Sequence, residues 1–134
     1  MRFVRRNISN INYSFDVNYP WYVLVEASQV TIDEFNNDLM DFMKQKYIEN
    51  AVISKNLNEK KSLWRIRDSI SAAQKSEGGS IKHDVSVPSS DVATFIVRSE
   101  KAVMEILPKS RVVAFGHVGD GNVHFNVSQP KDIS

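Results

Sequence analysis

Cysteine is absent from this sequence of 134 residues. Its absence excludes disulfides, cysteine-ligated zinc, iron–sulfur clusters and thiol nucleophiles, and it favours a reducing compartment. An excess of charge of one sign is also missing, because 17 basic and 16 acidic side chains leave a net charge of +1. A chain without a basic excess lacks the electrostatic footprint of nucleic-acid binding. Nucleic acid is therefore not expected as a partner.

Long apolar runs are absent as well. The longest, such as residues 21–25 and 111–115, have the length of a strand, whereas a membrane-spanning helix needs about 20 apolar residues. The basic residues at the start of the chain are followed by a polar segment with neither an apolar stretch nor a small-residue cleavage site. No transmembrane segment and no secretory signal are therefore expected.

Hydrophobic periodicity predicts an α+β fold. Residues 1–19 have the composition of an irregular connecting segment, and residues 20–134 are expected to form one domain. Helices are predicted at 32–47, where Thr31 and Glu34 form a capping box, at about 56–77 up to Gly78, and from Ser89 or Ser90 to Pro108. Strands are predicted at 21–26, 51–53, 81–87, 111–118 and 123–129. This order favours a largely antiparallel sheet with helices layered on one face, a ferredoxin-like arrangement that ends in a β-hairpin.

The predicted hairpin carries two of the chain's three histidines. Residues 119–122 read Gly-Asp-Gly-Asn, which favours a turn between two strands. If Val118 lies opposite Val123, then His117 lies directly opposite His124, and Phe115 and Asn126 share their face of the sheet. Paired imidazoles suit zinc and similar divalent metals, although a third ligand would be needed. The alternative is an exposed histidine pair that binds nothing.

The third histidine and a set of polar residues upstream allow weaker inferences. His83 lies on the apolar face of its predicted strand, where a hydrogen-bonded core histidine is expected. Arg67 and Ser71 share one face of a predicted helix, and Lys82 follows on the polar side of a strand. Together the three could bind a carboxylate. The alternative is a solvated helix face and an exposed lysine.

Four segments in order carry a family resemblance: residues 20–26 (PWYVLVE), 63–68 (LWRIRD), 82–88 (KHDVSVP) and 116–127 (GHVGDGNVHFNV). Together they resemble the C-terminal, substrate-side domain of FAD-linked oxidases and dehydrogenases. That family includes D-2-hydroxyglutarate dehydrogenase, D-lactate dehydrogenase and the glycolate oxidase D subunit. The resemblance implies that the chain is a fragment of such an enzyme, and that FAD is bound mainly by a domain that this sequence does not contain.

The resemblance also implies roles for individual residues. His117 and His124 correspond to ligands of a divalent metal, with Zn²⁺ expected, and His124 is expected to help remove the substrate's hydroxyl proton. Arg67, Ser71, Lys82 and Asn126 correspond to substrate contacts. A third metal ligand is expected from a later Glu-His-Gly segment of the family, which this sequence lacks.

The implied enzyme would oxidise a D-2-hydroxy acid to the 2-oxo acid and pass electrons to an electron-transfer flavoprotein, a quinone or oxygen. Without an FAD-binding domain or subunit the chain is expected to be inactive. Exposed apolar surface on the hairpin could drive formation of a homodimer. The expected location is the bacterial cytoplasm or the mitochondrial matrix. Two alternatives remain: a non-catalytic metal- or carboxylate-binding module or remnant of a decayed gene, and, less favoured, a hydrolase using the two histidines.

Overall fold

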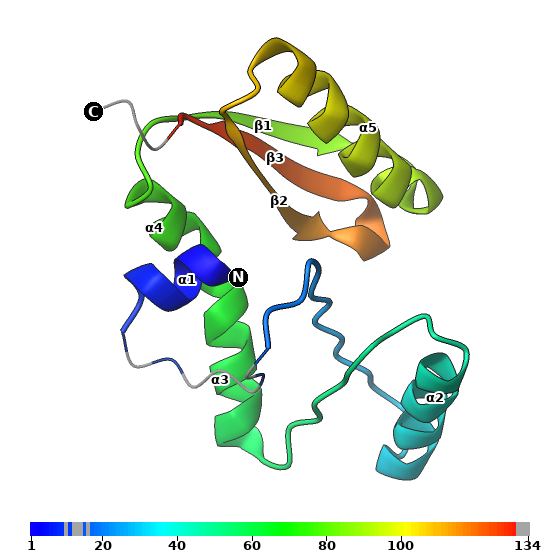
Figure 1. Ribbon diagram of the computed structural model, residues 1–134. Coiled ribbons are helices and arrows are strands. Elements are labelled where there is room, and N and C mark those ends of the chain that lie inside the picture. The colour runs from blue at the N-terminus through cyan, green and yellow to red at the C-terminus, as the bar shows by residue number, and fades with distance from the viewer. Residues whose placement is uncertain (10, 12–14, 16, 131–134) are drawn as a thin grey trace. The chain divides into compact units, whose positions relative to one another are not determined.

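A computed structural model describes residues 1–9, 11, 15 and 17–130 of the chain (Figure 1). The chain divides into two compact units, Met1–Ala73 and Gln74–Ser134, and each is described by itself. In chain order the elements are α1 (Arg2–Asn7), α2 (Ile32–Lys44), α3 (Leu57–Asp68), α4 (Ile70–Lys75), β1 (Ser80–Ser86), η1 (Ser89–Asp91), α5 (Val92–Ile106), β2 (Arg111–His117), η2 (Val118–Asp120) and β3 (Asn122–Ser128), with η denoting a 3₁₀ turn.

The first unit has a small helical core. Val4, Ile66 and Ala73 are buried there, at 0%, 6% and 0% exposure, and bring together α1, α3 and α4. Leu63 and Ile70 pack against this core. Helix α1 lies where the sequence pattern was interpreted as irregular. Its one buried residue, Val4, explains why so short a helix is held, since isolated helices of this length are unstable in water.

Helix α2 confirms the predicted capping box. The Thr31 side chain accepts a hydrogen bond from the Glu34 N–H, and the Glu34 carboxylate accepts one from the Thr31 N–H at 2.8 Å. Each side chain thereby satisfies a backbone donor that the first helical turn leaves open. The helix ends at Lys44 rather than at the predicted residue 47, because Lys46 has a φ of 61°, which a right-handed helix does not allow.

The two strands predicted in the first unit are wrong. Residues 21–26 and 51–53 are in extended or irregular backbone without strand pairing. Val23 and Val25 are 79% and 58% exposed. Aromatic and β-branched residues favour a strand only when a neighbouring strand and a covering layer use their side chains, and the described part of this unit provides neither.

The helix predicted over about 56–77 is present but interrupted. Asn56 caps α3 by accepting hydrogen bonds from the Asn58 and Glu59 N–H groups. Ser69 then separates α3 from α4. Gly78, with a φ of 103°, follows the second helix in the left-handed region, as the predicted glycine stop requires.

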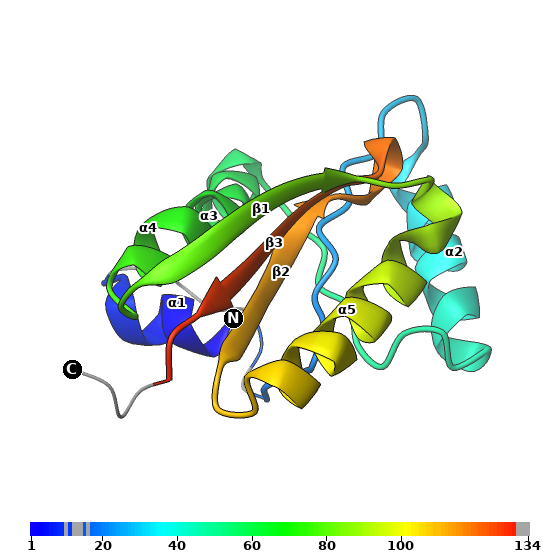
Figure 2. The same cartoon turned by 90° about the horizontal axis from the view of Figure 1, so that it is seen from above.

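The second unit contains a three-stranded antiparallel sheet in the order β1-β3-β2. Helix α5 connects β1 to β2, and β3 lies between these two strands and runs antiparallel to both. This is a split βαβ unit, as in half of a ferredoxin-like fold. Figure 2 shows α5 lying along the sheet. The predicted α+β class, with a helix layered on a largely antiparallel sheet that ends in a hairpin, is confirmed.

The core of the second unit lies between α5 and one face of the sheet. Val123, Phe125 and Val127 of β3 are buried at 2%, 5% and 9% exposure and form a cluster with Val92 of α5. Phe95 packs edge-on against Phe125, with ring centroids 5.8 Å apart. The expectation that the hairpin's apolar face is exposed is therefore wrong, because α5 covers it.

The start of α5 differs from the prediction. Neither Ser89 nor Ser90 caps the helix; both belong to the 3₁₀ turn η1, and Asp91 precedes the helix without a side-chain cap. The Ser89 hydroxyl instead donates to the Gly119 carbonyl at 3.2 Å, which links η1 to the hairpin turn. Among the described residues, no helix has the length and apolar character needed to cross a bilayer.

Candidate functional site

The turn of the hairpin determines its register. Val118–Asp120 form the 3₁₀ turn η2, and Gly121 follows with a φ of 73°. The Asp120 carboxylate accepts a hydrogen bond from the Asn122 N–H at 3.0 Å, so this side chain belongs to the turn. A Cβ atom on Gly121 would lie 1.8 Å from the Val87 carbonyl oxygen, so the turn packs closely on the end of β1.

The predicted register is wrong by two residues. His117 lies opposite Asn122, and Phe115 lies opposite His124. The turn occupies residues 118–121 rather than 119–122, because Asn122 is already the first residue of β3. An even shift keeps every side chain on its predicted face, since strand side chains alternate with a period of two. His117 and His124 are thus diagonal neighbours, with β-carbons about 7–8 Å apart.

The three strands place polar side chains in four rows on the sheet face opposite α5, which we call the polar face. Reading from β1 through β3 to β2, the rows are Ser80, Ser128 and Arg111; Lys82, Asn126 and Val113; Asp84, His124 and Phe115; and Ser86, Asn122 and His117. Four of the predicted site residues share this face: Lys82, His117, His124 and Asn126.

His124 is held from both sides within its row. Its Nδ1 atom contacts the Oδ1 atom of Asp84 across the β1–β3 pair. On the other side its ring lies against Phe115, with ring centroids 4.8 Å apart and planes tilted by 41°. The His124 side chain is 32% exposed and Asp84 is 74% exposed. The imidazole is therefore oriented by its neighbours while remaining open to solvent.

Asn126 lies in a buried polar cluster that we call the Gln74 network. The Asn126 amide nitrogen donates to Gln74 Oε1 at 2.8 Å, and Gln74 Nε2 donates to the Ser128 hydroxyl at 3.2 Å. Gln74, Asn126 and Ser128 are 1%, 4% and 1% exposed. The Asn126 Oδ1 atom is buried and has no hydrogen-bond partner among the described residues. Such an acceptor is costly to leave unpaired, by about 1–3 kcal/mol.

Lys82 lies directly opposite Asn126 on the edge strand β1 and is exposed. Its ammonium group has no partner among the residues that the structure describes. The second row of the polar face therefore combines a cation with an unpaired buried acceptor. Lys82 is open to an anionic group of a ligand, whereas the enclosed Asn126 Oδ1 atom has to be uncovered before a ligand can donate to it.

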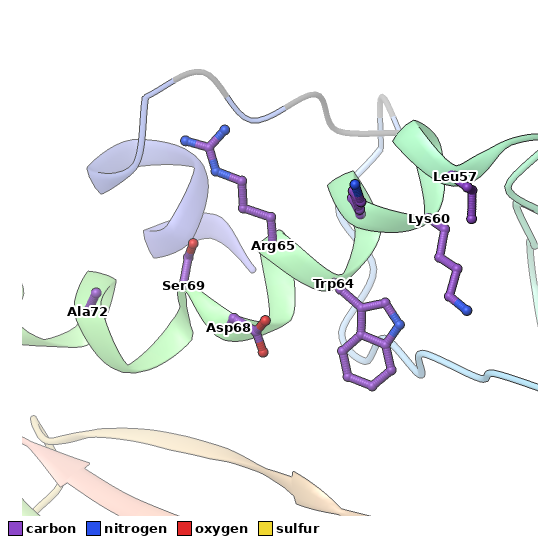
Figure 3. Close-up of a pocket in the computed structure, with 8 residues that line it drawn as sticks. Leu57, Lys60, Trp64, Arg65, Asp68, Ser69 and Ala72 are labelled. Atoms are coloured by element: carbon purple, nitrogen blue, oxygen red, sulfur yellow. The ribbon is translucent and has the colours of Figure 1, made fainter.

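Arg67 and Ser71 lie in the first unit, on α3 and α4. Arg67 is near Asp68, with a distance of 3.9 Å between Nη1 and Oδ1, and Ser71 is exposed. A hollow along the same helices is lined by residues that include Leu57, Lys60 and Trp64 (Figure 3). Neither Arg67 nor Ser71 lines it.

Two residues that line the hollow, Lys60 and Trp64, are hydrogen-bonded to Glu26. Glu26 accepts hydrogen bonds from Lys60 Nζ at 2.6 Å and from Trp64 Nε1 at 2.9 Å. These contacts lower the pKa of the Glu26 carboxyl below its ordinary 4.5 by stabilising the charged form. Lys60 and Trp64 are thus occupied by a structural contact rather than held ready for a ligand.

The donor set for a metal is incomplete. Among the described residues, no group of three or more histidine, aspartate or glutamate side chains is arranged to hold a metal ion. His117 and His124 supply two imidazoles on one face, and Asp120, the carboxylate nearest in sequence, is bonded within the turn. The chemistry of the two donors suits a divalent metal, but their number does not suffice.

His83 is hydrogen-bonded as expected but is not a core residue. Its Nδ1 atom lies 3.1 Å from the Phe125 carbonyl oxygen, which can only accept. The residue is exposed because β1 forms an edge of the sheet.

Sequence reasoning missed two residues that bond to side chains of the polar face, Asp84 and Gln74. By alternation Asp84 shares the polar side of its strand with Lys82, but nothing in the sequence indicated that β1 pairs with β3 and so brings Asp84 to His124. Gln74 gave no signal, because a single glutamine on a predicted helix resembles any solvated side chain.

Comparison with known proteins agrees with the motifs. The family described as FAD linked oxidases, C-terminal domain, matches residues 4–133. The chain is similar to D-2-hydroxyglutarate dehydrogenase of Stutzerimonas stutzeri (strain A1501), with 31% identity over 119 residues, which cover 87% of this chain and 25% of that protein. It is also similar to the mitochondrial D-2-hydroxyglutarate dehydrogenases of Danio rerio (30% identity over 115 residues, 83% of this chain and 21% of that protein) and Arabidopsis thaliana (25% over 134 residues, 96% and 23%).

The chain thus spans a quarter or less of the length of these curated relatives. The match nevertheless runs through both compact units, from α1 to the end of β3. The chain belongs to the family of the C-terminal domains of FAD linked oxidases.

Proposed function

We propose that this chain is the substrate-side part of an FAD-dependent oxidoreductase that converts a D-2-hydroxy acid to the 2-oxo acid. The observation that carries the proposal is the second row of the polar face, where Lys82 offers a cation beside the unpaired Asn126 Oδ1 atom. The names of the relatives support the 2-hydroxyglutarate class, and the lactate and glycolate classes carry the same two groups.

Each of three residues has a defined task in this proposal. The Lys82 ammonium binds the substrate carboxylate, and Asn126 Oδ1, which is enclosed in this structure, accepts the hydrogen bond of the C2 hydroxyl once it is uncovered. His124, one residue row away on β3, takes the hydroxyl proton as the hydride leaves C2. FAD, when bound by its own domain or subunit, accepts that hydride. The substrate then has lost one proton and one hydride and is a 2-oxo acid.

Arg67 and Ser71 are proposed as further substrate contacts on the basis of the family resemblance. Electron transfer onward to an electron-transfer flavoprotein or a quinone is proposed on the same basis. The homodimer was expected from exposed apolar surface on the hairpin, and it loses that support because α5 covers this face. The word "mitochondrial" in the names of the Danio rerio and Arabidopsis thaliana relatives supports the mitochondrial matrix as the location in a eukaryote.

Substrate binding is tested by calorimetry with D-2-hydroxyglutarate and D-lactate, using the L-enantiomers for comparison. A charge-assisted hydrogen bond contributes about 1.5–3 kcal/mol, so Lys82→Met should weaken binding about 10–100-fold. Lys101→Met is the matched control, because this exposed lysine lies on α5. Equal affinities for the wild type and Lys82→Met would contradict the proposed carboxylate site.

The reaction itself is tested by complementation. The chain is mixed with the Stutzerimonas stutzeri relative from which the matching segment has been deleted, and flavin reduction by the hydroxy acid is followed. Restored reduction that is lost with His124→Ala supports the proposal. Substrate binding without restored reduction favours a non-catalytic carboxylate-binding module instead.

As an alternative to the proton-acceptor role of His124, we propose that His117 and His124 supply two ligands of a divalent metal, with Zn²⁺ as the expected ion. In that case His124 Nε2 binds the metal, and another group takes the substrate proton. The place of the two histidines on one face and the contact of His124 Nδ1 with Asp84, which leaves Nε2 for a ligand, support this. Calorimetric titration with zinc should show binding that is lost in the His117→Ala/His124→Ala variant and kept in His83→Ala. Binding that is unchanged in the double variant would overturn this assignment.

A further inference from the structure

We propose that Asp84 is a positioning residue that holds the His124 imidazole in its Nδ1–H tautomer and thereby keeps the lone pair on Nε2. The role of Nε2 as the acceptor of the substrate proton rests on the proposed function, whereas the tautomer itself does not. Neither residue of the pair lies near the other in sequence, since Asp84 is on β1 and His124 is on β3.

The register of the β1–β3 pair brings Asp84 and His124 into contact. Asp84 and His124 are direct cross-strand partners, and directly opposed β-carbons are about 4.5–5.5 Å apart. The contact joins Asp84 Oδ1 to His124 Nδ1. A carboxylate only accepts hydrogen bonds, so Nδ1 must carry the hydrogen atom. A neutral ring with its hydrogen on Nδ1 has its lone pair on Nε2.

A second neighbour restricts the ring from the opposite side. Phe115 is the partner of His124 on β2, and its ring lies 4.8 Å from the imidazole centroid. The imidazole therefore lies between a carboxylate that orients its edge and an aromatic ring that limits its rotation. Preorganisation of this kind places a proton acceptor without cost at the moment of reaction.

The exposure of the pair separates this role from a role in stability. Asp84 is 74% exposed, so its removal opens no cavity in the core. Substitution should change the chemistry of His124 while leaving the fold of the sheet intact. The amide signals of Val123 and Phe125, both in the core beneath α5, verify that the fold is retained.

The test is proton–nitrogen correlation NMR of the histidine side chains of the full chain, recorded at a pH where neutral imidazole predominates. The wild type should show His124 mainly as the Nδ1–H tautomer. In Asp84→Ala the major tautomer should become Nε2–H, and Asp84→Glu should restore Nδ1–H in part. His83 is an internal reference, because its Nδ1 donates to the Phe125 carbonyl and should not change.

Ser86→Ala is the matched control, since Ser86 follows Asp84 on the same face of β1 and pairs with Asn122. It should leave His124 as Nδ1–H. A His124 tautomer that stays Nδ1–H in Asp84→Ala, with the fold retained, would overturn the proposal. So would a wild-type His124 that is mainly Nε2–H.

A kinetic measurement connects the tautomer to the reaction. In the complementation experiment, Asp84→Ala should lower kcat by at least tenfold and leave KM unchanged, because the residue orients the base without touching substrate. A wild-type chain that fails to complement overturns the proposed function alone, since the NMR result decides the positioning role independently. An unchanged kcat in Asp84→Ala overturns the catalytic consequence of the tautomer, whereas the tautomer itself is decided by the NMR result.

Discussion

Replacing Gln74 with methionine tests whether the Gln74 network holds the second unit together. Gln74 is 1% exposed, and its two hydrogen bonds go to Asn126 and Ser128, which are also buried. Methionine has a similar length and volume but cannot pair with either residue, so this change isolates the polar contribution.

The magnitude follows from the groups left unpaired. The Asn126 amide nitrogen would lose its acceptor, and a buried donor without a partner costs about 1–3 kcal/mol. The Ser128 hydroxyl would lose only the hydrogen bond that it accepts from Gln74 Nε2, and its own O–H can still donate, so it adds little. Gln74→Met should therefore lower the free energy of unfolding by about 1–3 kcal/mol. Gln74→Ala should lower it further, because the shortened side chain also leaves a cavity.

The assay has to report on the second unit. Both tryptophans, Trp21 and Trp64, lie in the first unit, so their fluorescence follows that unit. Urea unfolding is better followed by circular dichroism together with amide hydrogen exchange of Val123, Phe125 and Val127. Gln45→Ala, a change at an exposed glutamine after α2, is the control and should stay within about 0.5 kcal/mol of the wild type.

A double variant sharpens the result. Replacing both partners of a buried hydrogen bond with apolar groups is less costly than removing one. Gln74→Met combined with Asn126→Leu should therefore be less destabilised than the sum of the two single variants. Strict additivity, or a Gln74→Met variant as stable as the wild type, would refute the reasoning.

Two further predictions concern the hairpin turn and α2. Gly121→Ala should destabilise the second unit by at least about 2 kcal/mol in urea unfolding, because a Cβ would lie 1.8 Å from the Val87 carbonyl in a left-handed backbone; Gly119→Ala, whose Cβ meets no atom within 4 Å, should have little effect. Hydrogen bonds from Thr31 lower the pKa of the Glu34 carboxyl below 4.5, so this carboxylate stabilises α2 above that pH and the helicity measured by circular dichroism should fall as the pH drops through the lowered pKa. Thr31→Ala should remove this part of the acid transition, and an identical acid profile would contradict the assignment.

Local signals predicted much of the fold. The capping box marked the start of α2, and the alternation over residues 81–87 predicted β1 and its two faces. Gly78 marked the end of the helix before β1. Each of these features depends on residues within one turn or one strand, where backbone sterics and capping act directly.

Features that depend on distant partners were not predictable in the same way. The run at 21–26 has strong strand propensity, yet propensity expresses how well side chains fit a pleated, half-buried surface, and no such surface adjoins it in the described residues. Helix α1 differs from its prediction in the other direction, because it was expected to be irregular and is helical. Its sequence is unremarkable for a helix, and the burial of Val4 beside Ile66 and Ala73 supplies what the local sequence does not.

The candidate site shows that knowing the face of the strand on which each side chain lies is not enough to predict its neighbours, and hence its chemical role. Alternation assigned Lys82, Asp84, His117, His124 and Asn126 to polar positions, and an even shift in register leaves all of those assignments intact. Such a shift nevertheless changes every neighbour.

In the predicted register His124 faces His117, which favours a shared metal. In the observed register His124 lies between Phe115 and Asp84, and His117 is one diagonal step away. The ring is thereby oriented by a carboxylate with Nε2 open, which suits a proton acceptor and a metal ligand alike, and a metal would still depend on additional ligands. The neighbours that orient His124 are thus set by the turn, where η2 and the left-handed Gly121 start β3 at Asn122.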